Sequence, residues 1–250
     1  TTYFSLDAPP ADYGIVKFHY TVPIGWPVYC SSVQLDEHTC GLDLLGDPKN
    51  IERAILSQLT PVGQWERQAV QIGGMNLELL RGGKWAFPLD DFLKITQAPL
   101  VWQIEKMGGH NRSKFQIITD TYPVDIEIIG RASGGQRLFD STISMAMRDL
   151  PLADFVTSGL HTIVHEFFHT FAWNFPRGSR NKFAWFNEGM TDYMSWQSLM
   201  QTTLPMDKMA DFIAYSIEGY WNQEISKRIS IHEASQNRWE TPDSPWTQRQ

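Results

Sequence analysis

The segment from Phe155 to Trp173 constrains the fold most, because it is the most apolar part of the chain and yet contains three histidines and a glutamate. These polar residues interrupt it too often for a membrane span, which needs about 18 consecutive apolar residues. Apolar residues recur at three- and four-residue spacing, which predicts an α-helix from Leu160 to Trp173. We expect this helix to be buried and its polar residues to serve function.

The polar residues of this helix form the sequence His165-Glu166-Phe167-Phe168-His169. Positions four residues apart share one face of a helix, so the two imidazoles can bind one metal ion. Glu166 is adjacent to the first histidine and can act as a general base on a water molecule there. This arrangement is the H-E-x-x-H motif and predicts a zinc site. His161, one turn earlier, is either a hydrogen-bond donor behind the site or a packing residue.

Catalytic zinc sites usually have three protein ligands, and a third candidate lies downstream. Glu188 follows His169 after a gap in which the first helix can end and the chain can turn. A second helix, predicted from Glu188 to Met200, would then return antiparallel with Glu188 facing the histidines. Asp192 lies one turn further on the same face, where it can accept the remaining ring N–H of His165. The alternative interpretation is an exposed helix that carries two unrelated histidines. Glu188 and Asp192 make this alternative the weaker of the two.

The motif, an 18-residue gap and the sequence Asn187-Glu188-Gly189 resemble the gluzincin metallopeptidases, and most closely the glycyl aminopeptidase family (M61). The specific part of the resemblance covers His165–Thr170 and Trp185–Tyr193. Weaker similarity extends over most of the chain, at residues 22–26, 91–100 and 230–239. The resemblance implies an N-terminal β-domain, a zincin-type catalytic part, a bound zinc ion and a peptide or protein substrate.

The edge strand that precedes the metal helix departs from the family pattern. In the family this strand carries a Gly-Gly-Leu-Glu-His-like sequence, whose glutamate can hold the free amino terminus of a substrate. The matching stretch begins at Gly134 and Gly135, and Arg137 stands in place of the glutamate. The resemblance implies that these three residues bind substrate. A cation repels an ammonium group, so Arg137 favours a substrate carboxylate and argues against aminopeptidase specificity.

A second departure concerns the tyrosine that stabilises the oxyanion in this family. Its expected place downstream of Glu188 falls just past Gln250. Either the chain is a piece of a longer protein, or another residue serves; the candidates, each also explained by a structural role, are Tyr215, Tyr220 and His232. The main alternative to a peptidase is therefore a catalytically impaired zinc-binding or interaction protein that keeps the metal site. A zinc enzyme with a non-peptide substrate is a second alternative.

The two halves of the chain differ in their hydrophobic pattern. Runs of β-branched and aromatic residues predict strands at Ile15–Val22, Phe115–Ile118 and Val124–Ile129. After residue 140, helical spacing predicts helices at Ser141–Met147, Leu160–Trp173, Glu188–Met200 and Met206–Trp221. We expect an α+β protein. A β-sandwich-like domain over residues 1–130 would precede a mainly helical, zincin-like catalytic domain over residues 131–250, which begins with the edge strand.

Charge and cysteine content limit the partners. The net charge is −7 and no dense run of Lys or Arg is present, which excludes the basic face that nucleic-acid binding needs. Cys30 and Cys40 are the two cysteines. A disulfide, typical of exported proteins, and a pair of buried free thiols explain them equally well. The habit of the family also favours export, whereas nothing in the sequence indicates an oligomeric state.

Overall fold

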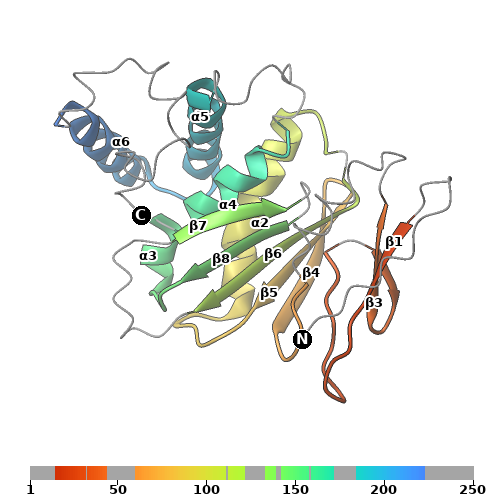
Figure 1. Ribbon diagram of the computed structural model, residues 1–250. Coiled ribbons are helices and arrows are strands. Elements are labelled where there is room, and N and C mark those ends of the chain that lie inside the picture. Colours follow the sequence, from red (N-terminus) through yellow and green to blue (C-terminus); the bar gives the residue numbers. More distant parts are fainter. Residues whose placement is uncertain are drawn as a thin grey trace.

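The computed structural model describes residues 15–31, 33–43, 60–110, 112–121, 133–138, 142–157, 159–171 and 184–222. This part of the chain contains two β-sheets and a group of helices (Figure 1), which confirms the predicted α+β class. None of the described helices is both long and apolar enough to cross a lipid bilayer.

The first sheet is small and antiparallel, with the strand order β1-β3-β2. Its strands are β1 (Ile15–His19), β2 (Val33–Asp36) and β3 (Thr39–Asp43). A disulfide joins Cys30 to Cys40, so the structure decides between the two explanations of the cysteines. Both cysteines are fully buried and pack with Phe18 and Val28 in the core of this sheet. The strand predicted at Ile15–Val22 is present over its first five residues.

The second sheet has five strands in the order β4-β5-β6-β8-β7. They are β4 (Glu66–Ile72), β5 (Met75–Arg81), β6 (Lys114–Thr121), β7 (Ser133–Leu138) and β8 (Thr142–Met147). A two-residue turn at Gly73 and Gly74, both with positive φ, joins β4 to β5 as an antiparallel hairpin. β5, β6 and β8 run parallel. A parallel pair needs a crossover connection, and α2 (Leu89–Lys106) provides it between β5 and β6.

Two expectations from the sequence need correction. The segment Ser141–Met147 was expected to be helical, but it forms β8, in which Ile143, Met145 and Met147 are buried and Ala146 between them is exposed. Large apolar residues at every second position give the period of a strand. In addition, β6 pairs with β8 across residue 130, so the division predicted there does not separate the two sheets. The strand expected at Val124–Ile129 lies outside the described residues.

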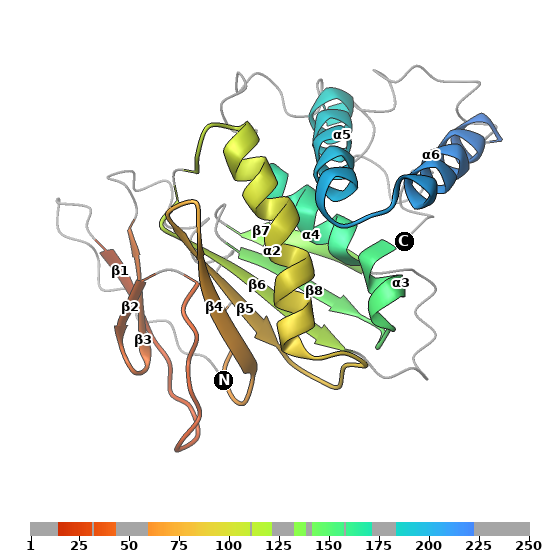
Figure 2. The ribbon, with the colours of Figure 1, turned by 180° about the vertical axis from the view of Figure 1, so that it is seen from behind.

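The described helices are α2, α3 (Leu152–Thr157), α4 (Gly159–Phe168), α5 (Ala184–Thr202) and α6 (Met206–Trp221). α2 and α4 pack on one face of the five-stranded sheet, and α2 lies directly across it (Figure 2). α5 packs on these two helices, and α6 contacts α5. Phe167 of α4 meets Phe115 of β6 edge to face, with 4.9 Å between the ring centres. Each such fully buried side chain stabilises the fold by about 1.5–3 kcal/mol. This core therefore fixes α4 on the sheet and makes it a rigid support for the residues on its other side.

The three later helices follow the sequence pattern closely. α6 has the predicted bounds, and α5 extends the predicted helix at both ends. α4 begins one residue before the predicted start and ends at Phe168, just before His169. The last two residues of that predicted helix lie outside the described part.

Candidate metal centre

α4 has two different faces, because its apolar and polar residues each recur at helical spacing. Its core face, fully buried against the sheet and α2, consists of Leu160, Ile163, Val164 and Phe167. The neighbouring face carries a row of histidines one turn apart: His161, His165 and His169. The backbone N–H of His169 still donates to the carbonyl oxygen of His165 at 3.3 Å. The regular four-residue spacing therefore continues past the end of α4 and places the rings of His165 and His169 together.

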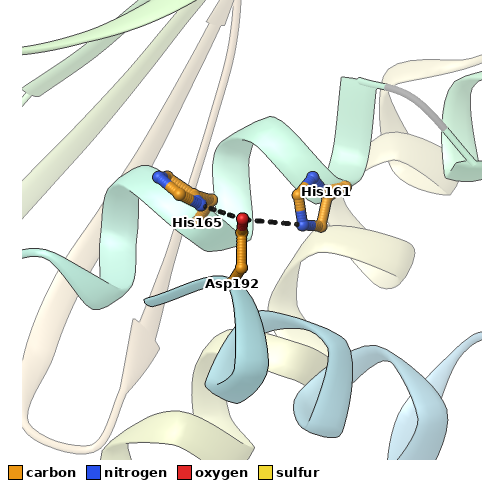
Figure 3. Close-up of side chains that lie close together, drawn as sticks. All are labelled: His161, His165 and Asp192. Atoms are coloured by element: carbon orange, nitrogen blue, oxygen red, sulfur yellow. Dashed lines mark hydrogen bonds and ion pairs between the residues drawn. The ribbon is translucent and has the colours of Figure 1, made fainter. Parts of the chain in front are cut away.

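α5 presents a matching row to these histidines and runs antiparallel to α4. His169 faces Glu188, with 3.4 Å between Nε2 and Oε2. His165 faces Asp192, with a hydrogen bond of 2.7 Å from Nδ1 to Oδ1 (Figure 3). His161 stacks on Trp196, with the ring centres 4.0 Å apart. Each pair is one helical turn from the next, so a single helix–helix contact aligns the whole site.

Three side-chain atoms from the two helices meet at one point. His165 Nε2 lies 3.2 Å from His169 Nε2 and 3.2 Å from Glu188 Oε2. The third side of the triangle, from His169 Nε2 to Glu188 Oε2, is 3.4 Å. Two ligand atoms about 2.0–2.1 Å from a tetrahedral zinc ion lie about 3.3 Å from each other. The spacing and the chemistry of these three donors therefore fit zinc, with the fourth position left for water or substrate.

A second group, His161, His165 and Asp192, also offers three donor atoms close together. Its atoms do not have the spacing of zinc ligands, since 2.7 Å between His165 Nδ1 and Asp192 Oδ1 is a hydrogen-bond distance. His161 Nε2 lies farther from the same oxygen, at 3.5 Å. Figure 3 shows the Asp192 carboxylate between the two rings. We therefore assign this group to the support of His165 and not to a second metal.

The two carboxylates control the protonation of His165. Burial favours the neutral ring, but hydrogen bonds to Asp192 and Glu188 outweigh it and raise the pKa of His165 to about 9. Burial lowers the pKa of His161 to about 4, a shift that the charge of Asp192 opposes and that of His165 reinforces. Near pH 7, the metal-free protein thus has a cationic His165 between two carboxylates and a neutral His161 stacked on Trp196.

Glu166 lies beside the two histidines. One of its carboxylate oxygens lies within 4.8 Å of one ring nitrogen of His165 and one of His169. The side chains of Glu188 and Asp192 are 31% and 51% exposed, so the α5 side of the site is open to solvent. A carboxylate at the edge of such a site can take up a proton from water or release one.

β7, the predicted edge strand, is the outermost strand of the sheet on the side of α4 (Figure 1). Its register against β8 shifts between Ser133 and Gln136, which makes a β-bulge at Gly134 and Gly135. Arg137 lies in the regular part of the strand, opposite Ile143. Bulges are common at sheet edges next to active sites, and the outer edge of β7 has no neighbouring strand among the described residues.

The candidates for oxyanion stabilisation are less well defined. Tyr215 and Tyr220 belong to α6, which contacts α5. Their side chains, like all of His232, lie outside what the structure describes.

Two residues of the site have no sequence signal that singled them out. Thr191 is fully buried, and its Oγ1 lies 3.3 Å from Nδ1 of His169. Trp196 stacks on His161. Both lie on the face of α5 that also carries Glu188 and Asp192, so the helical spacing from Glu188 is the signal that could have found them.

No protein-family model matches the chain, and no curated protein is similar enough in sequence to count as a relative. Among solved structures, the chain is similar to an aminopeptidase N family protein from Idiomarina loihiensis. The TM-score is 0.57 and the identity 15%, over 76% of this chain and 35% of that chain. An M1 zinc metallopeptidase from Deinococcus radiodurans matches at a TM-score of 0.40 and 12% identity, over 80% of this chain and 43% of that chain.

This chain thus spans about a third, 35%, of the length of the Idiomarina loihiensis protein. At 15% identity, the similarity concerns the arrangement of the backbone and says nothing of substrates. The chain shares the fold of a part of this aminopeptidase N family structure.

Proposed function

We propose that the chain is a zinc-dependent peptidase of the gluzincin type, most similar to the glycyl aminopeptidase family (M61). The observation that carries the proposal is the triangle of His165 Nε2, His169 Nε2 and Glu188 Oε2, with sides of 3.2, 3.2 and 3.4 Å. These three residues would hold the zinc ion. Zinc supplies polarisation of the scissile carbonyl and makes water acidic enough to lose a proton near neutral pH.

The residues of the chain provide the proton transfer and the orientation of the substrate. Glu166 accepts the proton of the attacking water on its carboxylate and passes it to the nitrogen of the leaving amine. An extended peptide would pair with the outer edge of β7, where backbone N–H and C=O groups can bind another strand. Arg137 would attract a carboxylate of the substrate, since its charge opposes an amino terminus.

The test is peptide cleavage and zinc content measured on the same samples of wild type, Glu166→Gln and Glu37→Gln. Glu37 is an exposed glutamate next to β2 of the small sheet and serves as the matched control. We expect about one zinc per chain in all three proteins. Cleavage by wild type and Glu37→Gln should be at least about 100-fold faster than by Glu166→Gln, which loses the general base.

Two other outcomes would change the proposal. If zinc binds and a panel of peptides stays uncut, the chain is better described as a zinc-binding or interaction protein, or as an enzyme for esters, which the same panel can include. If wild type binds no zinc, the proposed metal site is wrong.

A further inference from the structure

The ring of His169 has two nitrogens, and Nε2 is the one that belongs to the triangle of donor atoms. Its other nitrogen, Nδ1, lies 3.3 Å from the hydroxyl oxygen of Thr191. That hydroxyl also lies 2.8 Å from the backbone carbonyl oxygen of Asn187, one turn earlier in α5. Thr191 is fully buried and His169 nearly so, so water cannot readily take the place of either partner.

The direction of these hydrogen bonds follows from the chemistry of the groups. A carbonyl oxygen can only accept, so the single proton of the Thr191 hydroxyl points to Asn187. The hydroxyl oxygen can then only accept from the ring, and Nδ1 of His169 must carry a proton. A neutral imidazole carries one proton, on either nitrogen. With that proton on Nδ1, Nε2 has a free lone pair directed toward His165 and Glu188.

The two histidines of the site are therefore held by different chemistry. His165 donates to a carboxylate, Asp192, whose side chain is 51% exposed. His169 donates to a neutral hydroxyl that is wholly buried. An unpaired charge at such a position would be costly to bury, whereas a hydroxyl fixes the ring without adding charge. A single stretch of α5, from Asn187 to Asp192, supplies both partners and the third proposed ligand.

We infer that Thr191 is a positioning residue for His169. It holds the ring in the tautomer whose Nε2 lone pair faces the metal site, and so it lowers the cost of binding zinc there. The effect on zinc binding rests on the proposed function, but the tautomer of His169 is a property of the metal-free protein.

The experiment compares Thr191→Val, which keeps the shape and removes the hydroxyl, with Thr191→Ser, which keeps the hydroxyl. Ser195→Ala is the matched control, because the Ser195 hydroxyl is also buried in α5 and donates to a backbone carbonyl, that of Thr191. The first measurement is the tautomer of His169 in metal-free protein at alkaline pH, from the nitrogen shifts of ¹⁵N-labelled histidine. The signal is assigned with a His169→Gln variant.

We expect the Nδ1–H tautomer in wild type, Thr191→Ser and Ser195→Ala, and a substantial population of the Nε2–H tautomer in Thr191→Val. The second measurement is zinc affinity by competition with a chelator. Thr191→Val should bind zinc about 10- to 100-fold more weakly, while Thr191→Ser and Ser195→Ala stay close to wild type.

The inference is overturned if Thr191→Val keeps the Nδ1–H tautomer, or if Ser195→Ala weakens zinc binding as much as Thr191→Val does. A wild type that binds no zinc would refute the proposed function, and the tautomer measurement would still decide the role of Thr191. If Thr191→Val does not fold, Thr191→Ser and Thr191→Ala take its place: the tautomer should be retained in the first and lost in the second, and the reverse would refute the inference.

Discussion

A short hydrogen bond of 2.7 Å joins His165 to Asp192. It orients the ring so that Nε2 faces His169 and Glu188. A carboxylate behind a ligand histidine makes the ring a better electron donor and fixes its orientation. The charge of Asp192 should therefore matter for metal affinity, although the residue does not belong to the triangle of donors.

Replacing Asp192 by asparagine tests the charge, because the amide keeps the size and an acceptor oxygen. We expect zinc affinity to fall about 10- to 100-fold, measured by competition with a chelator. Asp211→Asn, on the exposed surface of α6, is the control and should bind zinc like wild type. An Asp192→Asn protein with wild-type affinity would mean that the negative charge contributes nothing to the site.

The sequence predicts the proposed metal ligands better than it predicts the residues that hold those ligands in place. The spacing of His165, His169 and Glu188 in the sequence predicts that their side chains lie together. In the structure their donor atoms lie within 3.4 Å of each other. Their role as metal ligands stays a prediction. The helical spacing from Glu188 places Thr191 on the same face of α5, but it does not show what the Thr191 hydroxyl contacts. A single threonine inside a helix has no pattern of its own, and its importance depends on which atom of which neighbour lies beside its hydroxyl.

At the scale of elements, the packing of α4 against its neighbours depends on a glycine at its first residue. Gly159 is buried, and a Cβ built there would lie 2.6 Å from the Phe155 ring and 2.7 Å from Met147 Cε. These distances are well below van der Waals contact of about 3.5–4.0 Å. The close approach of α4 to α3 and β8 therefore requires the absence of a side chain.

Gly159→Ala should lower the free energy of unfolding by about 1–3 kcal/mol, the usual cost of an overpacked core. Gly189→Ala is the matched control, because it also lies in a helix but a Cβ there would meet nothing within 4 Å. That change should leave stability unchanged or raise it by up to about 1 kcal/mol, since alanine favours helix. Urea unfolding of the metal-free proteins measures both, and equal effects at the two glycines would contradict the packing argument.

Helices with a clear apolar period were predicted best. α4 and α6 have such a period and begin within one residue of their predicted starts. α2 escapes prediction because Pro99 stands inside it and two polar residues of its buried face, Thr96 and Gln103, interrupt the apolar row. Gln103 is buried because it donates to the Val164 carbonyl of α4, at 3.2 Å. Partners so distant in sequence are not visible from local pattern.

At the scale of the whole molecule, a buried charged group connects the two sheets. Glu78 of β5 is only 2% exposed and accepts from Lys114 of β6, at 2.9 Å. Arg67 of β4 contacts its other oxygen at 2.6 Å. The Lys114 ammonium group also donates to the backbone carbonyl of Cys30, at 2.6 Å, in the core of the small sheet. No sequence pattern indicated this link, because its members come from three strands and a distant loop.

This link should make stability depend on pH. Burial alone would raise the pKa of Glu78, but Lys114, Gln116 and Arg67 outweigh it and hold the pKa below the ordinary 4.5. The ionised carboxylate thus favours the folded state. Its contribution is complete above about pH 4.5 and is lost as the pH falls through the pKa of the folded protein.

Glu78→Gln should accordingly lower the free energy of unfolding at pH 7 by about 2–4 kcal/mol, because it leaves the charges of Lys114 and Arg67 without their partner. We place the value below that of a fully buried pair, since the Arg67 side chain is 54% exposed and screened by water. Urea unfolding at about pH 7 and about pH 3 measures the effect, with Glu105→Gln on the exposed end of α2 as control. The gap between the free energies of unfolding of wild type and Glu78→Gln should narrow in acid, because below about pH 4.5 the unfolded wild-type chain takes up a proton at Glu78 more readily than the folded protein does. A gap that stays constant between the two pH values would show that the carboxylate acts through its shape and not through its charge.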